Sequence, residues 1–268
     1  MRLPLFQLDA FAERVFTGNP AAVCPLDAWL DDDVLQAVAA ENNLSETAFV
    51  VRRSPPDASD YEIRWFTPAV EVDLCGHATL ASAAVVLDTL EPGRERVRFH
   101  SRSGPLDVAR RGDLLELDFP ARPPRRLEAG LPGLAEALGV APLEVWQARD
   151  ILAVLADEEQ VRGLQPDLAR VAALPTFAVI VTAAGREADF VSRFFAPAKG
   201  VPEDPVTGSS HCTLVPYWAG RLGRERLRAR QLSARGGELL CELRGDRVAL
   251  AGRVARYLEG FVEVPGRR

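Results

Sequence analysis

An internal repeat at about half the chain length limits the possible folds of this sequence more than any other feature. Gly-Pro-Leu at 104–106 and Gly-Asp at 112–113 recur as Gly-Glu-Leu at 237–239 and Gly-Asp at 245–246, each 133 residues later. Apolar residues follow both Gly-Asp pairs at alternate positions, so each copy predicts a β-hairpin around a tight turn. The 268-residue chain is therefore expected to fold as two similar halves.

The repeat continues upstream of the hairpins at a slightly different offset. Thr-Ala-Phe-Val at 47–50 resembles Thr-Phe-Ala-Val at 176–179, and Phe-Thr-Pro at 66–68 resembles Phe-Ala-Pro at 195–197, both at an offset of 129. The offset changes within 198–203, which predicts a longer loop there because loops tolerate insertions. Each copy thus predicts the order strand, loop, glycine, helix and hairpin.

Hydrophobic periodicity predicts a mixture of strands and helices. Strands are expected at 3–11, 48–52, 62–66, 97–100, 106–109, 114–119, 151–155, 177–181, 189–195, 239–243 and 248–250, and helices at 32–40, 77–88 and 209–222. Small or apolar residues make up almost all of 77–88, which is typical of a helix buried on every side. The proline-rich stretch 120–126 predicts a boundary between an N-terminal domain, 1–120, and a C-terminal domain, 127–268, with the option that the last strand packs on the first domain.

Composition and charge exclude several classes of protein. The sequence is 47% hydrophobic and 26% charged with a mean hydropathy of −0.03, as expected for a soluble globular protein, and no apolar run is long enough to span a membrane. The N-terminus has no secretory signal pattern, so we expect a cytosolic protein. A net charge of −6 argues against nucleic acid as a partner. The arginine-rich stretch 221–235 is expected to be helical with a solvated face.

The four cysteines do not predict a metal site or a disulfide framework. They are widely spaced and include no Cys-x-x-Cys pair, so reduced thiols are expected. Cys-Gly-His at 75–77 and His-Cys at 211–212 combine metal-binding residue types, but adjacent residues rarely point at one ion and the usual ligand spacing is missing. We therefore predict no metal.

Each copy places a glycine and polar residues at the start of a predicted buried helix. Cys-Gly-His at 75–77 contains Gly76 and His77, and Thr-Gly-Ser-Ser at 207–210 contains Gly208 and Ser209. Free amides at a helix N-terminus bind carboxylate or phosphate without a cation. The alternative is that the glycines only allow tight turns and the polar residues only cap helices, but the pairing by repeat favours a small anionic ligand between the halves.

Three side chains beside these turns could transfer or orient protons. They are Glu46, His77 and Asp204. Glu46 has Pro175 as its counterpart at an offset of 129, so the carboxylate belongs to one half only. Each residue also has a structural explanation, namely a surface or capping glutamate, a core histidine, and an Asx-type turn before Pro205. Local spacing alone leaves both interpretations open.

At these residues the chain resembles the PhzF family, which is named for an isomerase of phenazine biosynthesis. The resemblance runs through ordered motifs at 9–11, 16–23, 43–49, 75–79 and 204–209 and covers nearly the whole chain. It implies the diaminopimelate-epimerase-like fold. This is an α+β fold of two pseudo-twofold-related domains, each a curved β-sheet or partial barrel around a central helix, with the site between them.

The resemblance also implies roles for individual residues. Glu46 would act as general acid/base, moving a proton between carbons of a small carboxylate substrate. His77 and Asp204 would orient and polarise that substrate, and the turn at Gly208 and Ser209 would bind its carboxylate, with Gly76 at the matching turn. No cofactor and no metal is implied, and a homodimer is expected.

Two other functions stay open beside this one. Related epimerases and racemases use two cysteines, one per domain, on opposite faces of the reacting carbon. Cys75 occupies the first of those places, but Thr207 occupies the second, and one thiol cannot run a two-base inversion. A Cys75-assisted epimerase is therefore the alternative enzyme, and a silent small-molecule-binding or interaction protein is the non-enzymatic alternative. The dihydro-hydroxyanthranilate of phenazine synthesis cannot be assigned as substrate from this sequence.

Overall fold

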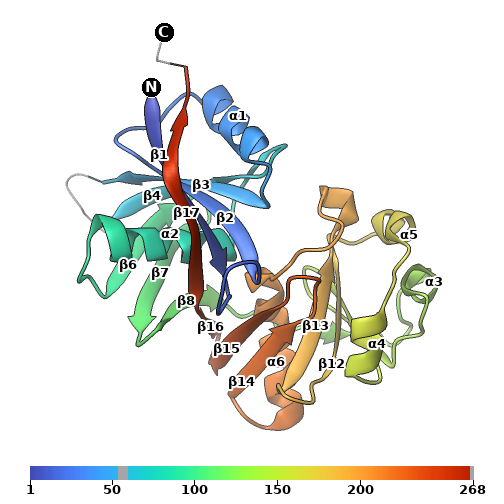
Figure 1. Cartoon of the computed structure of the whole chain (residues 1–268). Coiled ribbons are helices and arrows are strands. Elements are labelled where there is room, and N and C mark those ends of the chain that lie inside the picture. Colours follow the sequence, from blue (N-terminus) through green and yellow to red (C-terminus); the bar gives the residue numbers. More distant parts are fainter. Residues whose placement is uncertain (54–59, 266–268) are drawn as a thin grey trace. The chain divides into compact units, whose positions relative to one another are not determined.

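The structure is a computed structural model that describes residues 1–53 and 60–265. The chain divides into two compact units (Figure 1). Unit 1 contains Met1–Asp118 together with Ala251–Arg268, and unit 2 contains Phe119–Leu250. The sequence suggested ranges of 1–120 and 127–268. In the structure the last part of the chain lies in the first unit.

Unit 1 is a strongly curved, mixed sheet with one helix inside the curve and another outside it. The chain pairs β1 with β2, β3 with β4 and β6 with β7 as antiparallel neighbours, while β2–β3 and β4–β6 are parallel. Its elements are β1 (Arg2–Ala10), β2 (Asn19–Leu26), α1 (Asp32–Asn42), β3 (Glu46–Arg52), β4 (Tyr61–Phe66), β5 (Glu71–Val72), α2 (Gly76–Val85), a π-helical turn (Val86–Leu90), β6 (Arg96–Ser101), β7 (Gly104–Arg111), β8 (Leu114–Pro120, which runs into unit 2) and β17 (Val254–Glu263).

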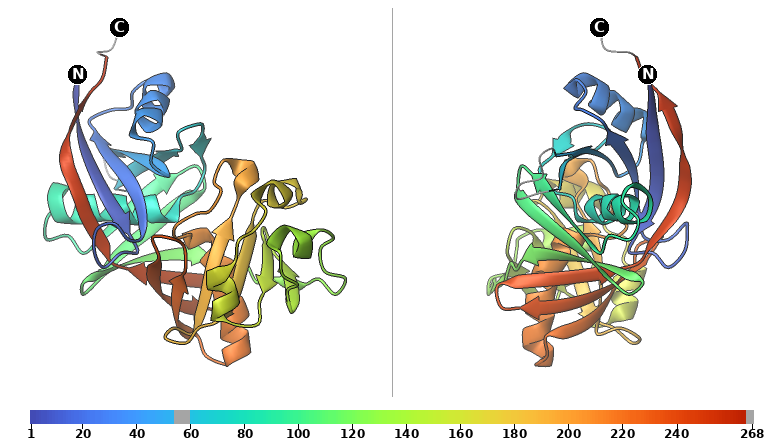
Figure 2. Two further views of the ribbon diagram at one scale, coloured as in Figure 1. Left: turned by 45° about the vertical axis from the view of Figure 1, so that its right-hand side comes forward. Right: turned by 90° about the vertical axis from the view of Figure 1, so that its left-hand side faces the viewer.

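Helix α2 is the centre of unit 1. Every residue from Gly76 to Val85 is buried, as the small and apolar sequence of 77–88 predicts. The helix contacts β1, β2, β3 and β17, and the second view in Figure 2 shows it enclosed by these strands. The expected α+β fold, with a curved sheet around a central helix, is confirmed.

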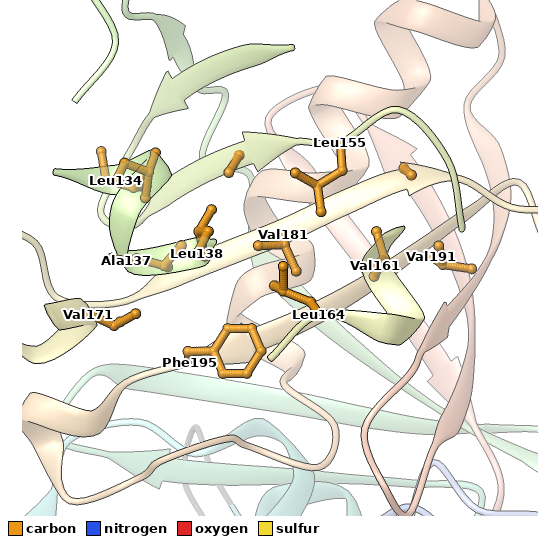
Figure 3. Close-up of a cluster of buried hydrophobic side chains, with 14 residues drawn as sticks. Leu134, Ala137, Leu138, Leu155, Val161, Leu164, Val171, Val181, Val191 and Phe195 are labelled. Carbon is orange, nitrogen blue, oxygen red and sulfur yellow. The ribbon is translucent and has the colours of Figure 1, made fainter. Parts of the chain in front are cut away.

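Unit 2 repeats this plan around helix α6. Its core packs small helices against β11 to β13, with Leu138, Val161, Val181 and Phe195 among the buried side chains (Figure 3). The elements are β9 (Arg125–Arg126), α3 (Leu134–Leu138), β10 (Glu144–Gln147), β11 (Ile151–Val154), α4 (Glu158–Gly163), α5 (Leu168–Ala173), β12 (Val179–Ala184), β13 (Phe190–Phe195), a 3-10 turn (Pro197–Lys199), α6 (Gly208–Leu222), β14 (Arg226–Gln231), β15 (Gly237–Arg244) and β16 (Arg247–Gly252, which ends in unit 1).

The two copies of the repeat exchange their last strands. After its hairpin, the first copy continues into β9, which pairs with β10 of unit 2. After its own hairpin, the second copy continues into β17, which pairs antiparallel with β1 along almost the whole of both strands. Each sheet is therefore completed by the strand that follows the other copy, and β17 lies in unit 1, as the option for the last strand allowed.

Strand register corrects the offset suggested by the upstream repeat. Thr47 lies opposite Phe66, and Val179 lies opposite Phe195. Because Phe66 and Phe195 match at an offset of 129, their partners Thr47 and Val179 match at 132. The reason is the connection between the paired strands, which spans 53–60 in unit 1 but only 185–189 in unit 2.

The helical prediction for the arginine-rich stretch 221–235 is wrong beyond its start. Arg221 lies in the last turn of α6, which ends at Leu222. The stretch then continues into β14, where exposed arginines alternate with buried Leu227 and Ala229. Arg226 and Arg228 pair across the sheet with glutamates of β15. The alternation of arginine and apolar residues has the period of a strand, and that pattern decides the conformation. None of the helices in the described residues is long and apolar enough to cross a membrane.

We predict that Arg193 anchors the segment leading to Asp204. Its buried guanidinium pairs with both Glu203 oxygens, at 2.6 and 2.9 Å, and donates to the Leu164 carbonyl at 2.6 Å. Arg193→Ala is expected to lower the free energy of unfolding by about 3 kcal/mol, because it leaves these groups without their partner. Urea denaturation measures the change.

Arg226→Ala is the matched control for Arg193→Ala. Arg226 also pairs with a glutamate of the same unit, but its side chain is 86% exposed. An exposed pair contributes less than about 1 kcal/mol. Equal losses in the two variants would contradict an anchoring role for Arg193.

Candidate active site

The structure brings two of the predicted catalytic residues into direct contact. Glu46 is the first residue of β3, and His77 is the second residue of α2. The distance from His77 Nε2 to Glu46 Oε2 is 3.0 Å, and the side chains are only 6% and 16% exposed. A carboxylate and an imidazole therefore share a largely buried position at the N-terminus of the central helix.

A third residue, Asn19, holds the other side of the imidazole ring. Its Nδ2 lies 3.1 Å from His77 Nδ1. When the ring is neutral, the amide donates to Nδ1 and the ring proton lies on Nε2, the nitrogen that is 3.0 Å from Glu46 Oε2. When the ring is protonated, the amide can turn over so that its oxygen accepts from Nδ1–H. Asn19 thus orients His77 in both protonation states.

Sequence reasoning did not single out Asn19, although it lies within the motif at 16–23. Its position depends on Gly18, which has φ +66° and whose added Cβ would lie 2.3 Å from the Ala10 carbonyl oxygen. Nearby, Asp9 Oδ2 accepts a hydrogen bond from the Phe16 amide at 2.8 Å. The glycine lets β2 begin close against β1, and this starts the strand with Asn19 beside α2.

Cys75 completes the cluster but is poorly suited to act as a base. Its Sγ lies 3.6 Å from His77 Nδ1 and 4.0 Å from Nε2. Burial raises the pKa of the Cys75 thiol to about 11, and the negative charge of Glu46 adds to the shift. The group is therefore a protonated thiol at neutral pH.

The environment of His77 favours its protonated form. Burial by itself would lower the pKa of His77, but the Cys75 sulfur and the Glu46 carboxylate raise it well above 6.5. Glu46 contributes to this rise because its Oε2 lies 3.0 Å from His77 Nε2.

Glu46, Cys75 and His77 also form a set of metal-ligand types, with ligand atoms within 4.8 Å of one another. These donors suit zinc in kind. Their directions differ, however, because the sulfur lies nearer to Nδ1 while the carboxylate lies at Nε2. A single imidazole lone pair cannot point at both partners. As arranged, the cluster fits proton exchange between Glu46 and His77 better than one bound ion.

Gly76 opens α2 in unit 1, whereas Asp204, Gly208 and Ser209 lie together in unit 2. The Thr207 hydroxyl donates to Asp204 Oδ2, and Gly208 and Ser209 open α6. Gln231 of β14 accepts from the Thr207 amide at 2.9 Å and donates to the Asp204 carbonyl at 2.8 Å. Gln231 therefore fixes the turn before α6, a role that no local sequence signal shows.

Neither central helix is capped at its N-terminus by the side chain of the preceding residue. Cys75 precedes α2 and Thr207 precedes α6, and neither makes a side-chain capping hydrogen bond. In each helix the side chain of the preceding residue therefore does not occupy the amides of the first turn, which an anion can use as donors.

The acidic residue is confined to unit 1. Strand register makes Ala178 the counterpart of Glu46, in place of the Pro175 that the offset of 129 suggested. Ala178 is buried and its carbonyl accepts from the Ile151 amide at 3.0 Å. The unit 2 position thus offers no group that could exchange a proton.

Comparison with known families gives a direct match over most of the chain. The family model described as phenazine biosynthesis-like protein, PhzC-PhzF, matches residues 8–260. The chain belongs to the PhzC-PhzF family. The resemblance inferred from the sequence motifs is thus confirmed.

Similar PhzC-PhzF proteins occur in bacteria and mammals. An uncharacterized isomerase of Pseudomonas aeruginosa is 56% identical, covering 98% of this chain and 100% of its own. A phenazine biosynthesis-like domain-containing protein of Rattus norvegicus is 41% identical, covering 98% of this chain and 99% of its own. Two relatives of this chain are named isomerases, which supports an isomerase activity for the chain.

Solved structures confirm the fold. A PhzF family protein of Enterococcus faecalis superposes with a TM-score of 0.94 at 46% identity, covering 98% of this chain and 100% of the other. A hydroxyproline epimerase of Agrobacterium vitis has a TM-score of 0.61 at 11% identity, covering 97% of this chain and 92% of the other. The second likeness concerns the fold alone.

We predict that Glu46→Gln lowers the pKa of His77, because the amide removes the negative charge that stabilises the imidazolium. Proton NMR titration of the histidine ring signals measures this pKa. In the wild type, His77 is expected to stay protonated above pH 6.5 and to lose its proton only at higher pH.

His211 is the internal reference for this titration. It is fully buried in α6, and burial lowers its pKa to about 4. Its signal should therefore not titrate near neutral pH in either variant. An unchanged His77 curve in Glu46→Gln would show that the carboxylate does not control the ring.

Proposed function

We propose that this PhzC-PhzF protein is a cofactor- and metal-independent isomerase that moves a proton between carbons of a small carboxylate substrate. One observation carries the proposal, the contact of 3.0 Å between Glu46 and the His77 ring at the start of the buried helix α2. A buried carboxylate beside a titratable partner is a common arrangement for general acid/base catalysis.

Glu46 is proposed to be the general acid/base. Its carboxylate takes a proton from one carbon of the substrate, the electron pair moves into the adjoining π system, and the carboxyl group returns the proton to another carbon. No electron is gained or lost, so the reaction needs no redox group. His77 supports the charged form of Glu46, because its Nε2 lies 3.0 Å from Glu46 Oε2 and Asn19 holds its ring in place.

The substrate carboxylate is proposed to bind at backbone amides and a hydroxyl group. Gly208 and Ser209 at the start of α6 would supply them, and in unit 1 Gly76 has the corresponding place at the start of α2. Asp204 would orient the substrate, its carboxylate being held by the Thr207 hydroxyl.

The thiol alternative has less physical support. Cys75 has a pKa of about 11, and the residue in the matching position of unit 2 is Thr207. A hydroxyl group is a much weaker acid than a thiol, so the two residues do not form a pair of interchangeable bases. A non-enzymatic binding protein would not need the Glu46 carboxylate at all.

We predict that Glu46→Gln lowers turnover by roughly 10²- to 10⁴-fold, the usual contribution of a positioned general acid/base. Glutamine keeps the shape of the side chain and loses the exchangeable proton. Turnover is measured by NMR as deuterium incorporation from heavy water, using a panel of cyclic and unsaturated carboxylic acids that begins with dihydro-hydroxyanthranilate.

Cys75→Ala is the matched control in the same cluster and should keep most of the activity. The comparison is valid only if both variants melt at the same temperature as the wild type. Loss of deuterium incorporation in Cys75→Ala together with its retention in Glu46→Gln would replace the Glu46 mechanism with a cysteine-centred one.

We also propose that the protein is a homodimer, as the family resemblance led us to expect. Large apolar side chains exposed on β17 support this proposal, among them Tyr257 and Phe261, which are 49% and 59% exposed. Exposed Phe16 packs edge-on against Tyr257 at 5.6 Å between ring centroids.

Light scattering tests the assembly directly. We predict a mass of twice 29.2 kDa at micromolar concentration. Tyr257→Glu should shift the mass towards the single chain, because it places a charge in the apolar surface. A wild-type mass of 29.2 kDa over the whole concentration range would rule the dimer out.

A further inference from the structure

We propose that Arg149 is the residue that makes the carboxylate site of unit 2 selective for an anion, acting through Ser209 and through its own charge. This inference rests on the proposed function, whose carboxylate site it deepens. Arg149 Nη2 donates to Ser209 Oγ at 3.2 Å. A guanidinium has donors only, so the Ser209 oxygen accepts in this contact and its own O–H remains to donate to a ligand.

Arg149 is itself held in a fixed orientation. Its Nε and Nη2 donate to the two carboxylate oxygens of Asp150 at 3.0 and 3.1 Å, and Asp150 is 1% exposed. The guanidinium also lies over the Phe177 ring, 4.4 Å from its centroid. Two oxygens and one aromatic face thus fix the plane of the group. No partner of Nη1 is found among the described residues, so this nitrogen can also donate to an anion.

Two cations lie over one aromatic ring beside the Arg149–Ser209 contact. The chain has a net charge of −6 and a single lysine, Lys199. That lysine lies over the same Phe177 ring as Arg149, with Nζ 5.2 Å from the centroid. Asp150 pairs with Arg149, and the Asp204 carboxylate lies at the same turn, so a carboxylate ligand would be attracted by the directed donors of Arg149 and not by a net positive charge.

The duplication supports a functional role for this contact. Ser209 is the second residue of α6, as His77 is the second residue of α2. Asn19 contacts His77 from the start of β2, and Arg149 contacts Ser209 from just before β11. Both copies therefore orient the second residue of the central helix by a side chain from the corresponding strand entrance.

The register of the sheets supports this correspondence. Ala22 pairs with Thr47, and Ile151 pairs with Val179. Because Thr47 and Val179 are equivalent, Ala22 and Ile151 are equivalent as well. Asn19 lies three residues before Ala22, and Arg149 lies two residues before Ile151. The same part of the scaffold orients a proton-exchanging ring in unit 1 and a hydroxyl donor in unit 2.

Binding of benzoate and benzamide tests the proposal without any turnover. The two probes share their shape, and only benzoate carries a charge. We expect Arg149→Gln to weaken benzoate binding roughly 10- to 100-fold, as for loss of a charge-assisted hydrogen-bond network, with benzamide binding changed less than threefold. Calorimetric titration measures both affinities.

Two further variants separate selectivity from folding. Arg149→Lys keeps a charge beside buried Asp150 but loses the planar fork, so it should fold normally and give an intermediate loss for benzoate. Arg226→Gln, at the exposed arginine of β14, should bind both probes as the wild type does. Equal losses for benzoate and benzamide in Arg149→Gln would indicate a merely structural role and overturn the inference.

The remaining outcomes are also decisive. Unchanged benzoate affinity in both Arg149 variants would overturn the inference, and so would failure of the wild type to bind benzoate. If benzoate binding depends on Arg149 but no acid of the panel incorporates deuterium, the anion site stands and the proposed isomerase reaction fails. If turnover depends on Glu46 but the Arg149 variants have the same KM as the wild type, the proposed reaction stands and this inference fails.

Discussion

A helix without a polar face is the constraint on which unit 1 depends. All ten residues of α2 are buried, so the sheet must curve around the helix and cover it on every side. The strands of the first copy do not complete that cover, because β17, from the far end of the chain, pairs with β1 and contacts α2. Burying one apolar helix therefore ties the two ends of the sequence into a single unit.

Burial at the start of α2 has opposite consequences for neighbouring groups. Cys75 loses water without gaining a cationic partner strong enough to compensate, and its thiol stays protonated at neutral pH. His77 loses as much water, but the carboxylate of Glu46 stabilises its charged form. Position relative to one carboxylate thus decides which group can exchange a proton, although both are equally enclosed by the sheet.

The two copies share a scaffold and differ in chemistry at equivalent positions. Where unit 1 has Glu46, unit 2 has Ala178, and where α2 is preceded by Cys75, α6 is preceded by Thr207. A symmetrical pair of bases is absent from these positions. The fold is shared with a hydroxyproline epimerase, but of these four positions only the one at Glu46 carries a carboxylate and only the one at Cys75 carries a thiol.

The sequence by itself determined the duplication, the buried helix, the hairpins and the motifs around Glu46 and His77, because each depends on local periodicity or on residues close together in the chain. It misjudged β14, where an alternating pattern was interpreted as helical. Only the tertiary structure decided the exchange of last strands and the partners Asn19, Gln231 and Arg149. Their contacts join residues 58, 24 and 60 positions apart, and such side-chain hydrogen bonds exist only after strand register and helix position are set by closure of the sheets.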